Sequence, residues 1–262
     1  MQSSTEIINK SEVIKKEAIP ASEKPLRKGV MSTFVARLFT VRQELAIELK
    51  RFVLLWQYQH PVPPFTLWWR LVLKRVIDLL GSVAALAIFS PVMILVSLVI
   101  KLDSKGPVIY AQQRVGRFGK LFKIYKFRSM RVDAEKAGPV WAAKRDDPRL
   151  TRIGGFLRRT HLDELPQIFN VLKGEMSLVG PRPERPCFVQ ELDQAIPRYD
   201  ERHLIKPGMT GLAQIHYCYD QSLADVRKKL RYDLLYVKRM CLALDLRILF
   251  STVLTIATGK GK

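Results

Sequence analysis

The most pronounced feature of the hydrophobic pattern is the run from residue 79 to residue 100, in which 22 residues carry no charge. At about 1.5 Å per residue, a helix of this length just crosses the hydrocarbon core of a membrane. Ser90 and Pro91 fall at its middle, where the proline removes a backbone hydrogen bond and favours a kink. Lys74 precedes the run and Lys101 follows it, so the positive-inside rule favours both ends on the cytoplasmic side.

This pattern favours a bent re-entrant helix over residues 71–102, which enters and leaves the membrane at one face. A straight membrane span and a helix buried in a soluble core are the alternatives that the run leaves open. The choice between them decides whether the rest of the chain lies on one side of a membrane or on two.

Two segments precede this helix. Residues 1–30 mix Ser, Glu, Lys and Ile without a sustained period, so we expect a flexible tail. Within residues 31–70, apolar residues recur at helical spacing with Arg and Lys between them, and we interpret this segment as an amphipathic membrane-surface leader. Packing on a core is the alternative. Trp68 and Trp69 at its end are typical of a membrane interface or of aromatic packing.

Residues 103–262 combine short strand patterns with longer helical ones. The expected strands are residues 108–112 and 123–130, and the expected helices are residues 186–204, 224–239 and 242–257. Pro197 is expected to kink or divide the first of these helices. We therefore predict a small domain of mixed α+β class, mainly α, with amphipathic helices at its surface.

The chain carries a formal net charge of +20. Between residues 105 and 159, 15 Lys or Arg stand against four Asp or Glu, which solubility alone does not require. This excess implies an anionic partner, which is a nucleic acid, an acidic membrane surface or a phosphorylated substrate. Cys187, Cys218 and Cys241 form neither a disulfide framework nor a zinc pattern, which favours a reducing, cytosol-facing location.

Two adjacent carboxylates, Asp163 and Glu164, lie among these cations, with Pro166 just behind them. Such a pair can supply one nucleophile or base and one metal ligand. The competing interpretation is the solvated start of a helix, where acidic residues and a following proline are also common. Spacing alone does not separate the two interpretations.

Five cations are candidates for binding the phosphate groups of a substrate. They are Lys126, Arg128, Arg158, Arg182 and Lys206. The first two belong to residues 123–130, where cations alternate with apolar residues, and the last opens the glycine-framed loop 206–211, whose exposed amides suit an anion. The arginines among them grip phosphate oxygens with a planar fork that lysine cannot reproduce. A solvated basic face is the alternative.

Several short motifs follow one another along some 190 residues. They are Lys74-Arg75-x-x-Asp78, Ser90-Pro91, Gln113-Arg114-Val115-Gly116, Lys126-Phe127-Arg128-Ser129-Met130, Asp147-Pro148-Arg149, Leu162-Asp163-Glu164-Leu165-Pro166-Gln167, Met176-Ser177-Leu178-Val179-Gly180-Pro181-Arg182-Pro183-Glu184 and Lys206-Pro207-Gly208-x-Thr210-Gly211. Each motif is weak alone, but in this order they make the chain resemble the monotopic bacterial sugar transferases, which are polyprenyl-phosphate phosphoglycosyltransferases.

The resemblance implies an enzyme that moves a hexose 1-phosphate from a UDP-sugar to undecaprenyl phosphate, releases UMP and opens the assembly of an exopolysaccharide, capsule or O-antigen. It makes Asp163 the nucleophile of a covalent phosphosugar intermediate, Asp163 and Glu164 the ligands of Mg²⁺, and Ser90-Pro91 the break of a re-entrant helix. Residues 103–262 become the cytosolic catalytic domain, at the cytoplasmic face of the bacterial inner membrane. Membrane lipids are expected partners, nucleic acid is not, and a homodimer is left open.

The chain departs from the family pattern at Leu212, where a tryptophan is common, and at Tyr217 and Cys218, where a Gly-Arg pair is common, so the sugar is not identified. Three other interpretations remain. The chain is a membrane-bound binder of nucleic acid or anionic lipid, a catalytically silent scaffold of the same fold, or an enzyme in which the lipid phosphate attacks the donor directly and Asp163 is only a metal ligand.

Overall fold

The computed structural model describes residues 64–136, 138, 147–217 and 222–258. The tail predicted for residues 1–30 lies outside these residues, as does the predicted leader up to residue 63. Helices dominate the described part of the chain, and its strands form two separate two-stranded sheets. The predicted class, mixed α+β and mainly α, is confirmed.

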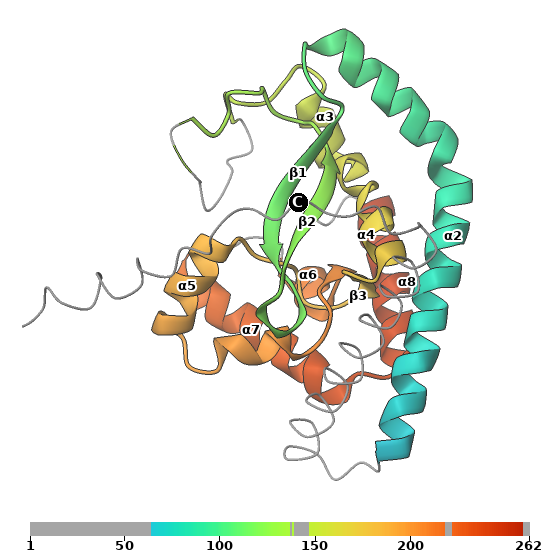
Figure 1. The fold of residues 1–262 in the computed structure, drawn as a ribbon, viewed down its shortest axis with the longest axis vertical. Coiled ribbons are helices and arrows are strands. Elements are labelled where there is room, and N and C mark those ends of the chain that lie inside the picture. The colour runs from blue at the N-terminus through green and yellow to red at the C-terminus, as the bar shows by residue number, and fades with distance from the viewer. Residues whose placement is uncertain (1–63, 137, 139–146, 218–221, 259–262) are drawn as a thin grey trace, which may run out of the picture. The chain divides into compact units, whose positions relative to one another are not determined.

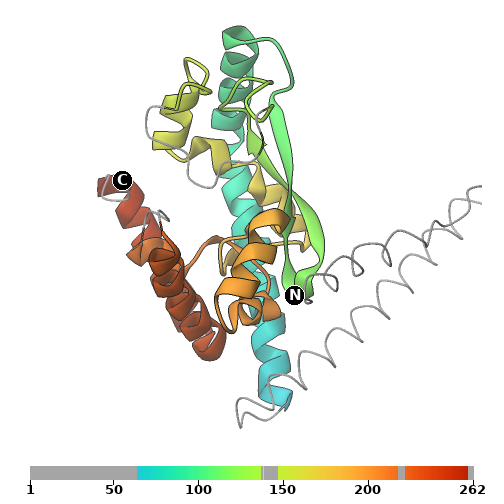
Figure 2. The same cartoon turned by 90° about the vertical axis from the view of Figure 1, so that its left-hand side faces the viewer.

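The elements follow one another in this order. They are α2 (Pro64–Asp103), β1 (Ile109–Val115), η2 (Arg117–Gly119), β2 (Leu121–Phe127), α3 (Gly154–Arg159), η3 (Leu162–Glu164), α4 (Gln167–Lys173), β3 (Ser177–Val179), α5 (Pro186–Ala195), η4 (Tyr199–Leu204), β4 (Gly208–Thr210), α6 (Leu212–His216), α7 (Leu223–Arg239) and α8 (Leu242–Thr258), where η marks a 3-10 helix. Figure 1 shows α2 running beside the other elements, and Figure 2 shows the β1–β2 hairpin on one side and the red C-terminal helices on the other.

The first half of α2 is fastened to the domain by three polar side chains. Lys74 donates to the Asp245 carboxylate of α8 at 2.7 Å. Arg75 donates to two carbonyls in the last turn of α4 at 2.6 and 2.9 Å, where the helix dipole also favours a cation. The buried carboxylate of Asp78 accepts a hydrogen bond from the Ser177 hydroxyl at 2.9 Å. The first motif of the sequence is therefore the joint between α2 and the domain.

The second half of α2 packs on a different part of the same domain. Met93, Val96 and Ile100 are buried against Phe127 of β2 and Leu157 of α3. The opposite face of the helix is apolar and exposed, at Leu80, Val83, Ile88, Ile94, Leu95 and Leu98. By length and composition alone, residues 68–103 are able to cross a membrane, and an 18-residue window within them has a mean hydropathy of 2.7.

The helix continues through the predicted break. Pro91 lies inside α2, and the Ser90 hydroxyl donates to the Ala87 carbonyl at 3.2 Å. The ribbon of α2 curves toward the hairpin in its second half (Figure 1). A proline and a serine whose side chain bonds the preceding turn are both known causes of helix bending. Re-entry into a membrane stays a prediction.

Two small sheets shape the centre of the domain. β1 pairs with β2 in an antiparallel hairpin, with Ile109 opposite Phe127. β3 pairs with β4 in parallel, with Ser177 opposite Gly208. A side chain at Gly208 would meet the backbone nitrogen of Gly180 at 2.0 Å, so only glycine permits this close approach.

The observed elements differ from the predicted ones in two places. The two strands extend as one hairpin over 109–115 and 121–127, because each partner satisfies the backbone of the other. The division predicted at Pro197 is confirmed, since residues 186–204 separate into α5 and η4 on either side of it. The prediction that the loop 206–211 exposes its backbone amides is wrong for Gly208. This residue is buried, and its N–H donates to the Pro181 carbonyl at 2.9 Å.

Candidate active site

The carboxylate pair lies on the short turn η3, between α3 and α4. The chain reverses direction just before it, because His161 adopts a left-handed backbone conformation with φ of 56°. Pro166 then begins α4 as its N-cap. This geometry turns the Asp163 side chain inward, and only 6% of Asp163 is exposed. A solvated helix start therefore does not describe the surroundings of Asp163.

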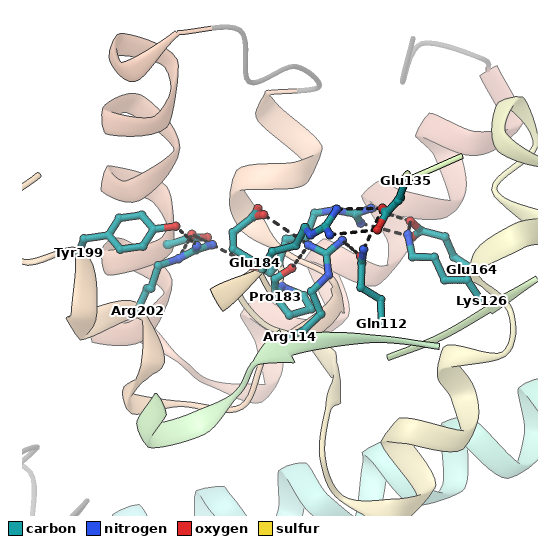
Figure 3. A network of polar contacts seen from close by, with 12 residues as sticks. Gln112, Arg114, Lys126, Glu135, Glu164, Pro183, Glu184, Tyr199 and Arg202 are labelled. Atoms are coloured by element: carbon teal, nitrogen blue, oxygen red, sulfur yellow. Dashed lines mark hydrogen bonds and ion pairs between the residues drawn. The ribbon is translucent and has the colours of Figure 1, made fainter. Parts of the chain in front are cut away.

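Glu164 is held by two cations from different segments. Lys126 of β2 donates to its Oε1 at 2.8 Å, and Arg182 donates to both of its oxygens at 2.6 and 3.3 Å (Figure 3). Burial disfavours the charged carboxylate, but Arg182 and Lys126 together hold the pKa of Glu164 well below its usual range. Glu164 is accordingly ionised and fixed in position.

Asp163 has a different environment. No hydrogen bond to its carboxylate comes from any residue that the structure describes. Burial raises the pKa of Asp163, and the nearby cation of Lys126 opposes this shift. The pair therefore consists of one carboxylate locked by cations and one whose oxygens are available. Neighbouring carboxylates in unlike environments are typical of sites that divide two chemical roles between them.

A cavity of about 1000 Å³ opens beside the pair. Six of the predicted site residues line it, namely Asp163, Glu164, Lys126, Arg128, Arg158 and Arg182. They come from β2 and the residue that follows it, from α3, from η3 and from the turn after β3. The fold thus gathers cations and carboxylates that are up to 56 residues apart in the sequence around one space. The cations offset the charge that an anionic ligand would bring into it.

The candidate phosphate-binding cations differ in the hydrogen bonds that their side chains already make and in their distance from the cavity. Arg158 donates no hydrogen bond to another residue within the described ranges. Arg128 is buried, and its guanidinium donates to the carbonyls of Ser104 and Lys105, just after α2, at 2.7 and 2.8 Å. Lys206 is not part of the cavity wall and lies near Gly174. Phosphate binding by Arg128 and by Lys206 therefore stays a prediction. The hydrogen bonds of Arg128 and the position of Lys206 outside the cavity wall do not favour it.

A buried ion pair that we did not predict supports Arg182. Arg202 donates to the Asp233 carboxylate of α7 at 2.8 and 3.1 Å and to the Tyr199 hydroxyl at 2.6 Å. It also donates to the backbone carbonyl of Arg182 at 2.9 Å (Figure 3). The sequence signal was present at Asp233, which shares the buried stripe of α7 with Leu230 and is an unusual residue for such a position.

The donor set around Asp163 is compatible with Mg²⁺. No group of three or more His, Cys, Asp or Glu side chains that would form an all-protein metal site occurs among the described residues. Mg²⁺ commonly takes one or two carboxylates and completes its octahedron with water and substrate phosphate. The available oxygens of Asp163 fit this mode, whereas Lys126 and Arg182 compete for those of Glu164.

The sequence is similar to known proteins over most of its length. The profile of the family described as "Bacterial sugar transferase" matches residues 69–259. The chain is 47% identical over 189 residues to the UDP-N-acetylgalactosamine-undecaprenyl-phosphate N-acetylgalactosaminephosphotransferase of Aeromonas hydrophila, a match that covers 72% of this chain and 44% of the relative. It is 44% identical over 201 residues to the exopolysaccharide production protein PSS of Rhizobium leguminosarum bv. phaseoli, covering 73% and 98%.

A third relative is the UDP-glucose:undecaprenyl-phosphate glucose-1-phosphate transferase of Escherichia coli K12, 44% identical over 184 residues, with 70% of this chain and 39% of the relative covered. The chain thus spans less than half the length of two of these relatives and nearly all of the other. The matched region contains α2 from residue 69 onward, the carboxylate pair and every cation around it. The chain belongs to the bacterial sugar transferase family.

Proposed function

We propose that this protein transfers a sugar 1-phosphate from a UDP-sugar to undecaprenyl phosphate, with release of UMP. The observation that carries the proposal is the unequal carboxylate pair. The buried Asp163 receives no hydrogen bond from the described part of the chain, whereas Lys126 and Arg182 hold Glu164. The names of the relatives supply the substrate classes, since they describe transfer of sugar phosphates to undecaprenyl phosphate.

In the first half of the reaction, an Asp163 carboxylate oxygen attacks the phosphorus that carries the sugar. The bond from this phosphorus to the oxygen bridging the two phosphates breaks, and that oxygen leaves with UMP. In the second half, an oxygen of undecaprenyl phosphate attacks the same phosphorus and the bond to Asp163 breaks. The sugar then resides on a lipid diphosphate, and the Asp163 carboxylate is restored.

The cations of the cavity serve both halves. Arg158 has its donors available for phosphate oxygens, and Arg182 offers a planar fork while it fixes Glu164. We propose that Asp163 and Glu164 also hold Mg²⁺, which offsets the charge of the two phosphates when it is bound. Lys126, which lines the cavity and contacts Glu164, acts to lower the pKa of both carboxylates and thereby favours their charged forms as the negatively charged donor approaches.

The substrates explain the apolar helix. Undecaprenyl phosphate has its phosphate at a membrane surface, whereas a UDP-sugar is soluble, so the enzyme has to meet both at the interface. We propose that α2 is a re-entrant helix that seats the domain on the cytoplasmic face of the bacterial inner membrane. Its exposed apolar face and its hydropathy support this placement. Production of a surface polysaccharide fits the name of the Rhizobium relative.

The test is UMP release by the purified protein with Mg²⁺, undecaprenyl phosphate and a panel of UDP-sugars. We expect one sugar to support turnover and Asp163→Asn to lower the rate about a thousandfold or more, because the amide removes the nucleophilic charge and keeps the shape. Asp193→Asn, on the exposed face of α5 and away from the cavity, is the matched control and should retain activity.

The same protein distinguishes the covalent route from direct attack by the lipid. Without undecaprenyl phosphate, the covalent route releases about one equivalent of UMP and leaves a sugar phosphate on the peptide that contains Asp163, which mass spectrometry detects. UMP release that always requires the lipid would assign Asp163 to metal binding alone. Full activity of Asp163→Asn would refute both roles.

A further inference from the structure

We propose that the part of the cavity walled by α8 and the β4–α6 segment holds the hydrocarbon chain of the lipid acceptor, next to the cations that take its phosphate. The inference rests on the proposed function and adds to it a location for the lipid. The part of the cavity lining that α8 contributes carries no charge and consists of Leu249, Thr252, Thr255 and Ile256. The β4–α6 segment adds Met209, Thr210, Ala213, Gln214 and Ile215 to this wall, whereas the charged lining residues come from other elements.

The threonine hydroxyls of this wall are already used by the protein, whereas the side-chain oxygen of Gln214 has no hydrogen-bond partner among the described residues. The Thr255 hydroxyl donates to the Ser251 carbonyl at 2.8 Å, and the Thr252 hydroxyl donates to the Ile248 carbonyl at 2.8 Å. The Thr210 hydroxyl lies 2.7 Å from that of Thr252 and, since the latter proton is spent, donates to it. The wall therefore offers no free hydroxyl proton to a sugar and presents mainly methyl and methylene groups, which suits an apolar ligand.

The wall continues to the outside of the protein. Ile256 lines the cavity and is nonetheless 51% exposed, so it lies at the rim. On the adjoining face of α8, Leu246, Phe250, Val253 and Leu254 form an exposed apolar stripe at helical spacing. The exposed apolar stripe of α8 and the uncharged α8 lining of the cavity thus meet at Ile256, which makes this rim an apolar path into the cavity.

The charge distribution selects the occupant. An amphiphile with an anionic head and a long apolar chain matches a cavity whose lining combines Lys126, Arg158 and Arg182 with the uncharged α8 wall. A UDP-sugar is polar throughout and would leave most of its hydroxyls unpaired against this wall, which offers the Gln214 oxygen as an acceptor. The structure therefore assigns the α8 wall to a polyisoprenoid chain and leaves the polar part of the cavity to the donor.

The decisive variant is Ile256→Asn, which places a polar amide in the proposed path of the lipid chain. Ile256 is half exposed and lies in the last turn of α8, so the substitution should affect folding little. We expect it to raise the KM for undecaprenyl phosphate about tenfold, equivalent to about 1.4 kcal/mol. Release of one equivalent of UMP in the absence of lipid should stay unchanged. The control Leu235→Asn, at an exposed aliphatic residue of α7 that does not line the cavity, should change neither quantity.

Each other outcome is informative. An unchanged KM in Ile256→Asn would overturn the lipid path while leaving the proposed function intact. If Ile256→Asn no longer releases one equivalent of UMP in the absence of lipid, the wall binds the UDP-sugar. This result would also overturn the assignment of the wall to the lipid chain. If the unaltered protein releases no UMP, the proposed function fails. Photolabelling with a lipid then tests the position of the hydrocarbon chain without relying on enzyme activity. A polyprenyl phosphate with a diazirine in its chain should label residues 248–258, whereas labelling confined to α2 would overturn the inference.

Discussion

At the scale of single residues, two carboxylates that are neighbours in the sequence have opposite properties. The pKa of Glu164 is low because Arg182 and Lys126 contact it directly, and the pKa of Asp163 is raised because the side chain is buried. The difference arises from three-dimensional neighbours that lie 38 and 18 residues away from Glu164 in the sequence. One residue of the pair is thereby suited to hold a position and the other to react.

The geometry of the Arg182 fork gives a prediction at this scale. Arg182 bridges both oxygens of Glu164, and a lysine provides only a point charge that cannot bridge them in the same plane. We expect Arg182→Lys to lower kcat/KM about tenfold to a hundredfold, equivalent to about 1.4 to 2.7 kcal/mol of transition-state stabilisation. Steady-state release of UMP measures this loss.

The chain offers a matched control for that substitution. Arg198 makes a similar two-point contact with Glu201 on the surface, away from the cavity. Arg198→Lys should leave kcat/KM unchanged within about twofold, because an exposed pair contributes little even to stability. Equal effects of the two substitutions would mean that the fork at Glu164 has no part in the reaction.

The candidate site residues are predictable to the extent that their chemistry is visible in the sequence. Adjacent carboxylates in a basic region are unusual, so the sequence singles out Asp163 and Glu164, and both line the cavity. Arg202 was missed, because a cation in a polar segment gives no sign of being buried until α7 supplies Asp233. The open loop predicts phosphate binding by Lys206, but β4 pairs with β3 there and the side chain lies near Gly174 outside the cavity wall, so this role stays a prediction.

At the scale of elements, α2 depends on the polar contacts of its first half with the domain as much as on its apolar run. The 22-residue apolar run predicted the helix, since no charge interrupts it. The extent of the helix was not predictable from that run, because α2 begins 15 residues earlier, where Lys74, Arg75 and Asp78 contact three other elements. In a sequence, polar residues next to an apolar run look like a solvent-exposed helix end. Only the structure shows that their partners are other elements of the domain.

The buried joint at Asp78 gives a prediction about stability. One oxygen of Asp78 accepts from both the Ser177 hydroxyl and the Leu178 amide, at 2.9 and 3.0 Å. Asp78→Ala leaves these donors without an acceptor and should lower the free energy of unfolding by about 1–3 kcal/mol. Asp78→Asn keeps an oxygen at this position and should lose much less. Thermal unfolding in detergent distinguishes the two, and equal losses would show that the charge of Asp78 matters rather than its hydrogen bonds.

At the scale of the whole molecule, the described part of the chain limits how α2 can meet a membrane. Arg75 near one end of the helix contacts α4, and Ile100 near the other end packs on Phe127 and Leu157. Both ends therefore contact one folded domain, which cannot lie on both sides of a bilayer. The exposed apolar face between them remains free to enter the membrane from one side. The positive-inside rule leads to the same topology from the flanking cations.

This topology predicts the accessibility of the two helix ends. After Cys187, Cys218 and Cys241 are replaced by serine, single cysteines are introduced by Arg70→Cys and Lys105→Cys, both at exposed positions. A membrane-impermeant maleimide should label both in inverted inner-membrane vesicles and neither in intact spheroplasts. Lys228→Cys, on the exposed face of α7, reports the side that the domain occupies. Labelling of the two ends from opposite sides would establish a membrane span and would require the contacts of α2 at Arg75 or at Ile100 to be absent in the membrane.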